Sequence, residues 1–236
     1  MELICNGSLI VNLMTRSPPL RLAILISGRG SNMATIARAG LEHRINANTV
    51  VVICDRTDAP GIAVARALGI ETHVIPWQGA ADRGVFERAL GAAIDASTPD
   101  LIVLAGFMRV LSKSFVERYA GRMLNIHPSL LPKYRGLHTH RRVLESSDRE
   151  HGASVHFVTA ELDGGPVALQ SKVDVAPDDT EATLSARVQA TEHTIYPQVI
   201  GWIAEGRLTW RAGDAWLDGK PLEAPLVEEF GTHARR

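Results

Sequence analysis

An asparagine and a histidine stand two residues apart where a short apolar run ends. Residues 123–126 predict a strand, and because alternate residues of a strand point to one side, Asn125 and His127 should project together. Pro128 holds His127 in an extended conformation. A neutral amide can donate to a developing oxyanion, and imidazole suits proton transfer at about pH 7. The pair is therefore a candidate catalytic group, and the alternative is a strand-end cap beside a structural histidine.

Asp163 is a third candidate, in the segment ELDGGP at 161–166. The two glycines permit a sharp turn that could bring the carboxylate inward. Beside His127, a carboxylate would favour the protonated imidazole and orient the ring. Alone, the segment predicts only a turn. Asp163 is therefore a catalytic candidate only in combination with Asn125 and His127.

A possible phosphate site lies in the segment SGRGSN at 27–32, between a predicted strand at 22–26 and a predicted helix at 31–39. Two glycines allow a tight turn that exposes backbone N–H groups, and the helix N-terminus adds partial positive charge. The alternative is a tight turn in which Ser31 caps the helix.

A dinucleotide-binding turn has a similar sequence, and two residues bear on that alternative. Such a turn has Gly or Ala three residues after its second glycine, where this chain has Met33. Asp55, at the end of the second predicted strand, resembles the acid that binds a ribose. The missing small residue weakens the NAD alternative, and Ser31 and Asn32 favour a terminal monophosphate.

The elements that position these residues follow from apolar runs that alternate with helical patterns. Runs without polar alternation indicate strands buried on both faces, and hence a parallel sheet covered by helices. We expect an α/β, Rossmann-like fold: an open, mostly parallel sheet with helices on both faces, and a small C-terminal hairpin. The predicted strands are 22–26, 50–54, 71–75, 101–105, 123–126, 154–158 and 167–175, the helices are 31–39, 60–68, 83–96 and 181–205, the last interrupted by Pro197, the segment 127–140 is a loop, and the hairpin pairs 208–210 with 215–217.

The composition excludes several classes of protein. The chain has 236 residues, 45% of them hydrophobic and 22% charged, which suffices for a sizeable core and excludes global disorder. The net charge of −1 gives no basic field, so we expect no nucleic-acid partner. No stretch reaches the ~18 apolar residues that cross a bilayer, so we expect no membrane partner. Nine histidines without metal-ligand spacing predict no catalytic metal.

The ends of the chain and its cysteines bear on the domain boundaries and on the cellular location. We expect residues 1–20 to be a dispensable extension, 21–220 a single domain and 221–236 a tail, with the last fifteen residues frayed. The N-terminus has neither the basic region nor the cleavage site of a signal peptide. Cys5 and Cys54 cannot form a disulfide framework and suit a reducing compartment. These features predict a cytoplasmic protein.

Taken together, the motifs resemble those of the phosphoribosylglycinamide formyltransferases, folate-dependent enzymes of purine synthesis. The resemblance runs from Leu22 to Gly219. Asn-x-His and the aspartate are shared across the wider formyltransferase superfamily, whereas GLHTH and QATEH narrow the match. The stretches that carry it are ISGRGSN, LAGFMRVLS, GRMLNIHPSLLPKYRGLHTH, HGASVHFVTAELDGGPV and QATEHTIYP.

The resemblance implies roles for particular residues. Asn125, His127 and Asp163 would form the catalytic group. Two residues depart from the family pattern: Arg29 stands where a small polar residue is common, and Arg135 where proline is common. Arg29 could assist phosphate binding, and Arg135 puts the rigidity of its loop in doubt. The ribonucleotide and its phosphate would be bound by Gly30, Ser31, Asn32, Arg83, Gln189, Ala190, Thr191 and Glu192, and the folate by Met108, Arg109, Val110, Leu111, Asn125, Thr159, Ala160, Glu161, Leu162 and Asp163.

The implied reaction is formyl transfer from 10-formyltetrahydrofolate, a co-substrate, to the amine of glycinamide ribonucleotide. The amine would attack directly, with Asn125 and protonated His127 stabilising the oxyanion. The resemblance implies small-molecule substrates and a monomer or homodimer. Three alternatives remain: a formyltetrahydrofolate hydrolase, an NAD-dependent oxidoreductase, and a noncatalytic binding module on the same fold.

Overall fold

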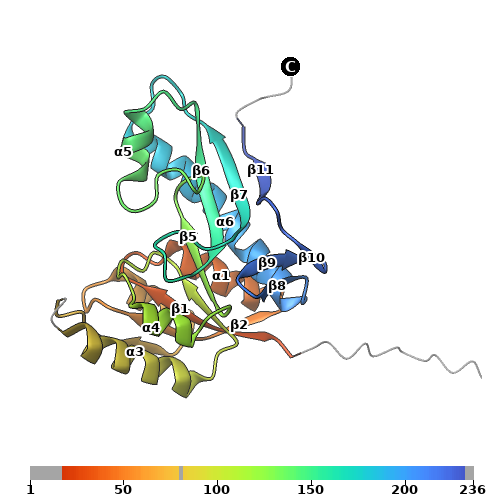
Figure 1. The fold of residues 1–236 in the computed structure, drawn as a ribbon. Helices are drawn as coiled ribbons and strands as arrows, with labels where there is room; N and C mark the ends of the chain where they lie inside the picture. Colours follow the sequence, from red (N-terminus) through yellow and green to blue (C-terminus); the bar gives the residue numbers. More distant parts are fainter. Residues whose placement is uncertain (1–17, 80–81, 232–236) are drawn as a thin grey trace, which may run out of the picture.

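The computed structural model describes residues 18–79 and 82–231, which form an eight-stranded sheet, a three-stranded sheet and six helices (Figure 1). The large sheet contains β1 (Leu20–Ile26), β2 (Ala47–Cys54), β3 (Thr72–Val74), β4 (Leu101–Leu104), β5 (Met123–His127), β6 (Glu150–Phe157), β7 (Val167–Asp174) and β11 (Leu226–Glu229). The helices are α1 (Ser31–Leu41), α2 (Pro60–Ala67), α3 (Arg83–Ser97), α4 (Lys113–Arg118), α5 (Thr139–Leu144) and α6 (Glu181–Ala204). The small antiparallel sheet contains β8 (Leu208–Arg211), β9 (Asp214–Leu217) and β10 (Lys220–Pro221).

The large sheet has the strand order β11-β7-β6-β5-β4-β1-β2-β3. Strands β3, β2, β1, β4 and β5 are parallel, and β6 pairs antiparallel with both β5 and β7. The predicted open, mostly parallel sheet and the C-terminal hairpin are confirmed. The carboxyl ends of the parallel strands meet at one edge, where open α/β sheets bind their ligands.

Two hydrophobic cores cover the two faces of the sheet. Leu22, Ile24 and Ile26 of β1 pack with α1, α2 and α6, whereas Ala23 and Leu25 pack with α3 and α4. The same division is visible in Figure 1, where α3 and α4 lie on one side of the sheet and α1 and α6 on the other. Burying an aliphatic side chain of this size contributes about 1.5–3 kcal/mol. Because β1 is apolar on both faces, it holds the turn that follows it rigidly.

Several expectations about the elements need correction. Pro197 does not interrupt the long helix, because α6 runs through it from Glu181 to Ala204. Its neighbours Tyr196 and Val199 are fully buried, and their packing offsets the missing backbone hydrogen bond. The patterns gave no sign of α4, and α5 begins at the end of the segment predicted as a loop.

The C-terminal segment differs most from the expected fold. The expectation that the last fifteen residues are frayed is wrong for Leu226–Glu229, which form β11 and pair in parallel with β7. Lys172 of β7 adds an ion pair to Glu229 at 2.8 Å. The predicted division at 20, 220 and 236 otherwise stays a prediction, and residues 1–17, including Cys5, lie outside the described part. No helix within the described ranges is long and apolar enough to span a membrane.

Candidate active site

The turn after β1 leads into α1 through a glycine in the left-handed region. Gly30 has φ 74° and occupies the N-cap position, so Ser31 is the first helical residue and not the cap. A Cβ on Gly30 would lie 3.0 Å from Met33 Cε and 3.1 Å from the Gly61 Cα. The backbone angle therefore favours glycine, and a Cβ would in addition force small shifts of these neighbours. The first N–H groups of α1 have no intrahelical partner and are available to an anion.

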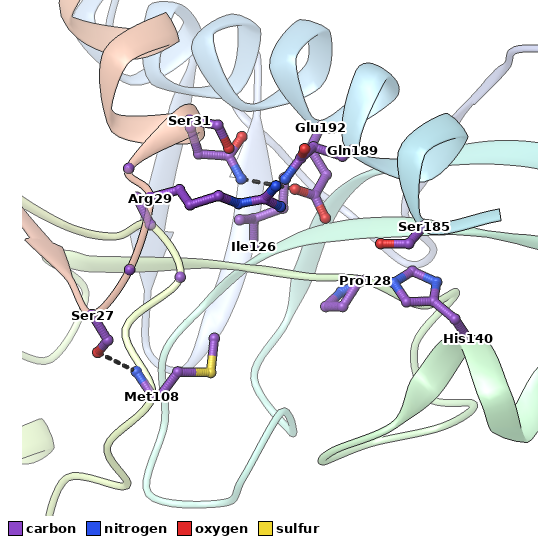
Figure 2. A pocket seen from close by; sticks show the side chains of 15 residues that line it. Ser27, Arg29, Ser31, Met108, Ile126, Pro128, His140, Ser185, Gln189 and Glu192 are labelled. Carbon is purple, nitrogen blue, oxygen red and sulfur yellow. Dashed lines mark hydrogen bonds between the residues drawn. The ribbon is translucent and has the colours of Figure 1, made fainter. Parts of the chain in front are cut away.

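A cavity of about 300 Å³ opens at this helix end (Figure 2). One wall is the segment 27–32, and the opposite wall is α6 with Ser185, Gln189 and Glu192. The predicted phosphate-binding residues Gly30, Ser31 and Asn32 all line it. The structure thus brings the predicted phosphate turn and part of the predicted ribonucleotide segment together across one cavity.

Glu192 and Asn32 form a buried polar pair in the wall of this cavity. Asn32 Nδ2 donates to Glu192 Oε2 at 2.7 Å, and both residues are 7% exposed. Burial raises the pKa of Glu192, although the hydrogen bond from Asn32 opposes the shift. Asn32 Oδ1 has no partner among the described residues. An unpaired acceptor beside a carboxyl group suits a ligand that carries hydroxyl groups, such as a sugar.

A second cavity, of about 460 Å³, lies beyond the carboxyl ends of β4 and β5. Its lining includes apolar side chains that are more than half exposed: Met108 (62%), Val110 (58%), Leu137 (71%) and Leu162 (54%). Such a concentration of exposed apolar surface marks a binding site. All ten residues predicted to bind folate line this cavity: Met108, Arg109, Val110, Leu111, Asn125, Thr159, Ala160, Glu161, Leu162 and Asp163.

The two cavities share a wall. Gly106, Met108, Ile126, Pro128 and His140 line both of them. The Met108 N–H donates to Ser27 Oγ at 2.8 Å, which ties the loop after β4 to the turn after β1 (Figure 2). Ligands in the two cavities would therefore meet beside β5.

The candidate catalytic residues line the second cavity next to this shared wall. His127 Nδ1 lies 3.4 Å from Asp163 Oδ2, and each side chain is 8% exposed. His127 Nε2 donates to the Tyr134 carbonyl oxygen at 3.0 Å. Both ring nitrogens thus face oxygen atoms, and a proton on each nitrogen satisfies both contacts. The arrangement places an imidazole paired with a carboxylate next to the shared wall, which suits proton transfer.

The turn that follows β6 brings Asp163 inward, as the glycines predicted. Asp163 has φ 49°, and its Oδ2 accepts from the Gly136 N–H at 2.9 Å. A Cβ on Gly165 would lie 1.9 Å from the Phe157 carbonyl oxygen, so glycine is required there for the close approach. The sharp turn thus places a carboxylate from 36 residues along the chain beside His127.

Asn125 is held by a histidine on the neighbouring strand. His156 Nδ1 donates to the Phe157 carbonyl oxygen at 2.9 Å, so its Nε2 accepts from Asn125 Nδ2 at 3.1 Å. Burial lowers the pKa of His156, which keeps the ring neutral and able to accept. One N–H of Asn125 is therefore engaged, and the other is free to donate to an oxyanion.

Comparison with known proteins identifies the family. A sequence profile described as formyl transferase matches residues 20–200. The chain belongs to the formyl transferase family.

Individual relatives and solved structures support the same family assignment. The chain is 53% identical to phosphoribosylglycinamide formyltransferase of Escherichia coli (strain K12), over 86% of this chain and 96% of that protein. It is 39% identical to the trifunctional purine biosynthetic protein adenosine-3 of Homo sapiens, over 85% of this chain and 20% of that protein. The structure of phosphoribosylglycinamide formyltransferase from Coxiella burnetii matches with TM-score 0.84 and 47% identity, over 89% of this chain and 99% of that one.

The structure also explains Asp55, the residue that resembled a dinucleotide ribose-binding acid. The Asp55 side chain is fully buried, and its Oδ2 accepts a short hydrogen bond from Arg109 Nε. The Arg109 guanidinium also lies 5.5 Å from the centre of the Trp77 ring. Asp55 therefore anchors the loop after β4 and cannot reach a ribose, which removes the main support for the NAD alternative.

Three residues predicted to bind the ribonucleotide line neither cavity: Arg83, Ala190 and Thr191. Arg83 opens α3, and its Nε is buried without a partner among the described residues. The Thr191 hydroxyl instead lies 2.6 Å from Ser171 Oγ and donates to the Val188 carbonyl oxygen at 2.8 Å. Thr191 thus ties α6 to β7.

Sequence reasoning missed two residues that support the candidate site. The role of His156 depends on the pairing of β5 with β6, which places it directly opposite Asn125. Arg135, which raised doubt about its loop, pairs with Glu161, a residue that lines the second cavity, and so links the two loops. The available signal for His156 was a polar residue in an apolar strand predicted near the strand of Asn125. No local pattern revealed the pairing of Arg135 with Glu161.

Proposed function

We propose that the chain transfers the formyl group of 10-formyltetrahydrofolate to the amine of 5'-phosphoribosylglycinamide, giving N-formylglycinamide ribonucleotide and tetrahydrofolate in de novo purine synthesis. The observation that carries the proposal is the position of Asn125, His127 and Asp163 beside the shared wall of the two cavities. A nucleophile bound in one cavity and a formyl donor bound in the other would meet at these three side chains.

The smaller cavity suits the ribonucleotide. Its helix N-terminus would hold the phosphate, which carries negative charge and many acceptor oxygens. Asn32 and Glu192 would bind the ribose hydroxyl groups, because one offers an unpaired acceptor and the other a buried carboxyl group. The glycinamide amine would then extend toward Pro128 and the end of β5.

The larger cavity suits the folate. The apolar side chains of Met108, Val110 and Leu162 offer flat contacts to aromatic rings. Backbone groups of the loops 106–111 and 159–163 can hydrogen-bond the ring heteroatoms. This division places the formyl-bearing nitrogen near Asp163 and His127.

The proposed chemistry needs no covalent enzyme intermediate. The neutral amine attacks the formyl carbon, a new N–C bond forms, and the carbonyl oxygen becomes an oxyanion. The free N–H of Asn125 and the protonated His127 stabilise that charge. The C–N10 bond then breaks, while the proton lost by the amine reaches N10 through His127 or a water held by Asp163.

We further propose that the reaction requires no metal, and that the chain acts in the cytoplasm as a monomer or a homodimer. In support of the first point, residues 18–79 and 82–231 contain no group of three or more His, Cys, Asp or Glu side chains placed to hold a metal ion. In the proposed mechanism Asn125 and His127 stabilise the oxyanion, and no step is assigned to a Lewis acid.

A two-substrate absorbance assay tests the proposal. The enzyme is mixed with a 10-formyl folate in the presence and absence of glycinamide ribonucleotide, and the folate spectrum is followed. Turnover that requires both substrates is the expected result. Release of formate from the folate alone would instead establish the hydrolase. Binding of both substrates without turnover would establish a binding module, and quenching of NADH fluorescence would revive the oxidoreductase.

A further inference from the structure

Arg29 stands in the middle of the phosphate turn, and its side chain lies in the smaller cavity. It lines that cavity with Ser31, Gln189 and Glu192, and in Figure 2 it extends from the turn toward α6. Its backbone lies in the turn between the end of β1 at Ile26 and the start of α1 at Ser31. Within the described ranges its guanidinium group makes no hydrogen bond or ion pair. The group is therefore available to a ligand.

The charges around the cavity make this arginine distinctive. Of the described residues that line it, three carry titratable side chains: Arg29, His140 and Glu192. Burial lowers the pKa of His140, which favours the neutral ring. Burial raises the pKa of Glu192, which weakens its charge as a competitor for Arg29. Among the described residues that line this cavity, Arg29 thus carries the positive charge. Arg83, the cation that the resemblance placed near the phosphate, lines neither cavity.

We propose that Arg29 binds the phosphate of the ribonucleotide and determines the preference of the site for a phosphorylated substrate. The inference rests on the proposed function, because it takes glycinamide ribonucleotide as the occupant. A guanidinium fork matches two phosphate oxygens, and the N–H groups of α1 approach the same group from the other side. The phosphate would be held between the backbone N–H groups of α1 and the guanidinium group of Arg29.

This arrangement predicts how binding depends on salt. Arg29 is solvent-exposed, and an exposed charge pair is screened by salt with a Debye length of about 10 Å at 0.1 M. The Michaelis constant for the ribonucleotide should therefore rise with salt in the wild type, and less so without Arg29. The Michaelis constant for the folate should not follow this pattern.

The test compares Arg29→Ala and Arg29→Lys with a matched control, Arg38→Ala. Arg38 is an exposed arginine in the last turn of α1, so its loss changes the net charge equally but far from the cavity. Steady-state rates give kcat and both Michaelis constants at low and high salt. Calorimetry with ribose 5-phosphate and with ribose measures phosphate binding without any formyl transfer.

We expect Arg29→Ala to raise the Michaelis constant for the ribonucleotide and the Kd for ribose 5-phosphate about tenfold, which corresponds to one charge-assisted hydrogen bond. Arg29→Lys should recover part of the loss, and Arg38→Ala and the binding of ribose should stay unchanged. Equal values in Arg29→Ala, Arg38→Ala and the wild type would overturn the inference.

The two proposals can fail separately. If ribose 5-phosphate binding depends on Arg29 but the wild type transfers no formyl group, the phosphate assignment stands and the proposed function is wrong. If the wild type transfers formyl groups but the Arg29→Ala constants match the wild type, the proposed function stands and Arg29 has no role in binding the phosphate. Thermal unfolding of each variant checks that the exposed substitution leaves the fold intact.

Discussion

The proposed phosphate end and the proposed catalytic end of the site are built in different ways. The phosphate end comes from one contiguous segment, in which β1, a glycine turn and α1 follow each other within 20–41. The catalytic end combines β5, the facing strand β6 and the turn at 161–166, with Tyr134 supplying a carbonyl oxygen. A locally built site can be recognised from residue spacing, whereas a site assembled from distant segments depends on how the strands pair.

The two ends also differ in what they offer a ligand. The phosphate end presents backbone N–H groups and one exposed arginine, which act through charge and are weakened by salt. The catalytic end presents side chains that are nearly buried, with His127 and Asp163 each 8% exposed. Binding should therefore be controlled at one end and the rate of chemistry at the other.

The largest expected effect is at the catalytic end. Asn125→Ala removes the amide that is free to donate to the oxyanion and should lower kcat about 10²–10³-fold, with the Michaelis constant for the ribonucleotide nearly unchanged. The two-substrate assay measures the loss, and thermal unfolding controls for stability. A kcat within a few-fold of the wild type would remove Asn125 from the oxyanion role.

Acid should lower the stability of the folded protein through His151, a buried residue of β6. Burial, followed by the nearby His140, lowers the pKa of His151 to about 4 from an ordinary value of 6.5. Between these two pH values the unfolded chain binds a proton that the folded chain does not. The free energy of unfolding should therefore fall by up to about 1.4 kcal/mol per pH unit as pH drops through this window, and level off below it.

His151→Gln tests this acid sensitivity. Urea unfolding at several pH values should show a flatter dependence in the variant than in the wild type between pH 6.5 and about 4. Parallel curves for the two proteins would contradict a lowered pKa for His151. His156, whose pKa is also lowered by burial, remains in both proteins. Because His140 Nδ1 lies 3.0 Å from His151 Nε2, the difference reports the titration of His151 together with its effect on His140.

The glycines of the phosphate turn should differ in their tolerance of alanine. Gly30→Ala places a Cβ in the left-handed region and against Met33, and should cost about 1–2 kcal/mol of unfolding free energy. Gly28→Ala is the matched control, because a Cβ there meets no atom within 4 Å. Chemical denaturation compares the two, and equal stabilities would show that the turn is not fixed as described.

The smallest expected effect concerns the anchor of the folate wall. Asp55→Asn removes the charge that holds Arg109 and should raise the Michaelis constant for the folate about 2- to 10-fold, with less change for the ribonucleotide. Arg56→Ala is a suitable control, because Arg56 is exposed and its guanidinium pairs with the exposed Asp58. An unchanged constant for the folate would show that Asp55 does not position the loop.

These differences explain how far the sequence alone could predict the protein. The strand, turn and helix at 20–41 were predictable because apolar runs and glycines act locally. Asn125 and His127 were recognisable by spacing, and Asp163 only in combination with them. His156, the pairing of Asp55 with Arg109, and β11 were not predictable, because each depends on which segments become neighbours in space.

The most direct test of this account measures kcat and both Michaelis constants for Arg29→Ala and Asn125→Ala side by side. We predict a crossed pattern. Arg29→Ala should raise the Michaelis constant for the ribonucleotide about tenfold with kcat nearly unchanged. Asn125→Ala should lower kcat about 10²–10³-fold with the Michaelis constant for the ribonucleotide nearly unchanged. If either substitution alters kcat and the Michaelis constant for the ribonucleotide together, ribonucleotide binding and chemistry are not divided between the two ends.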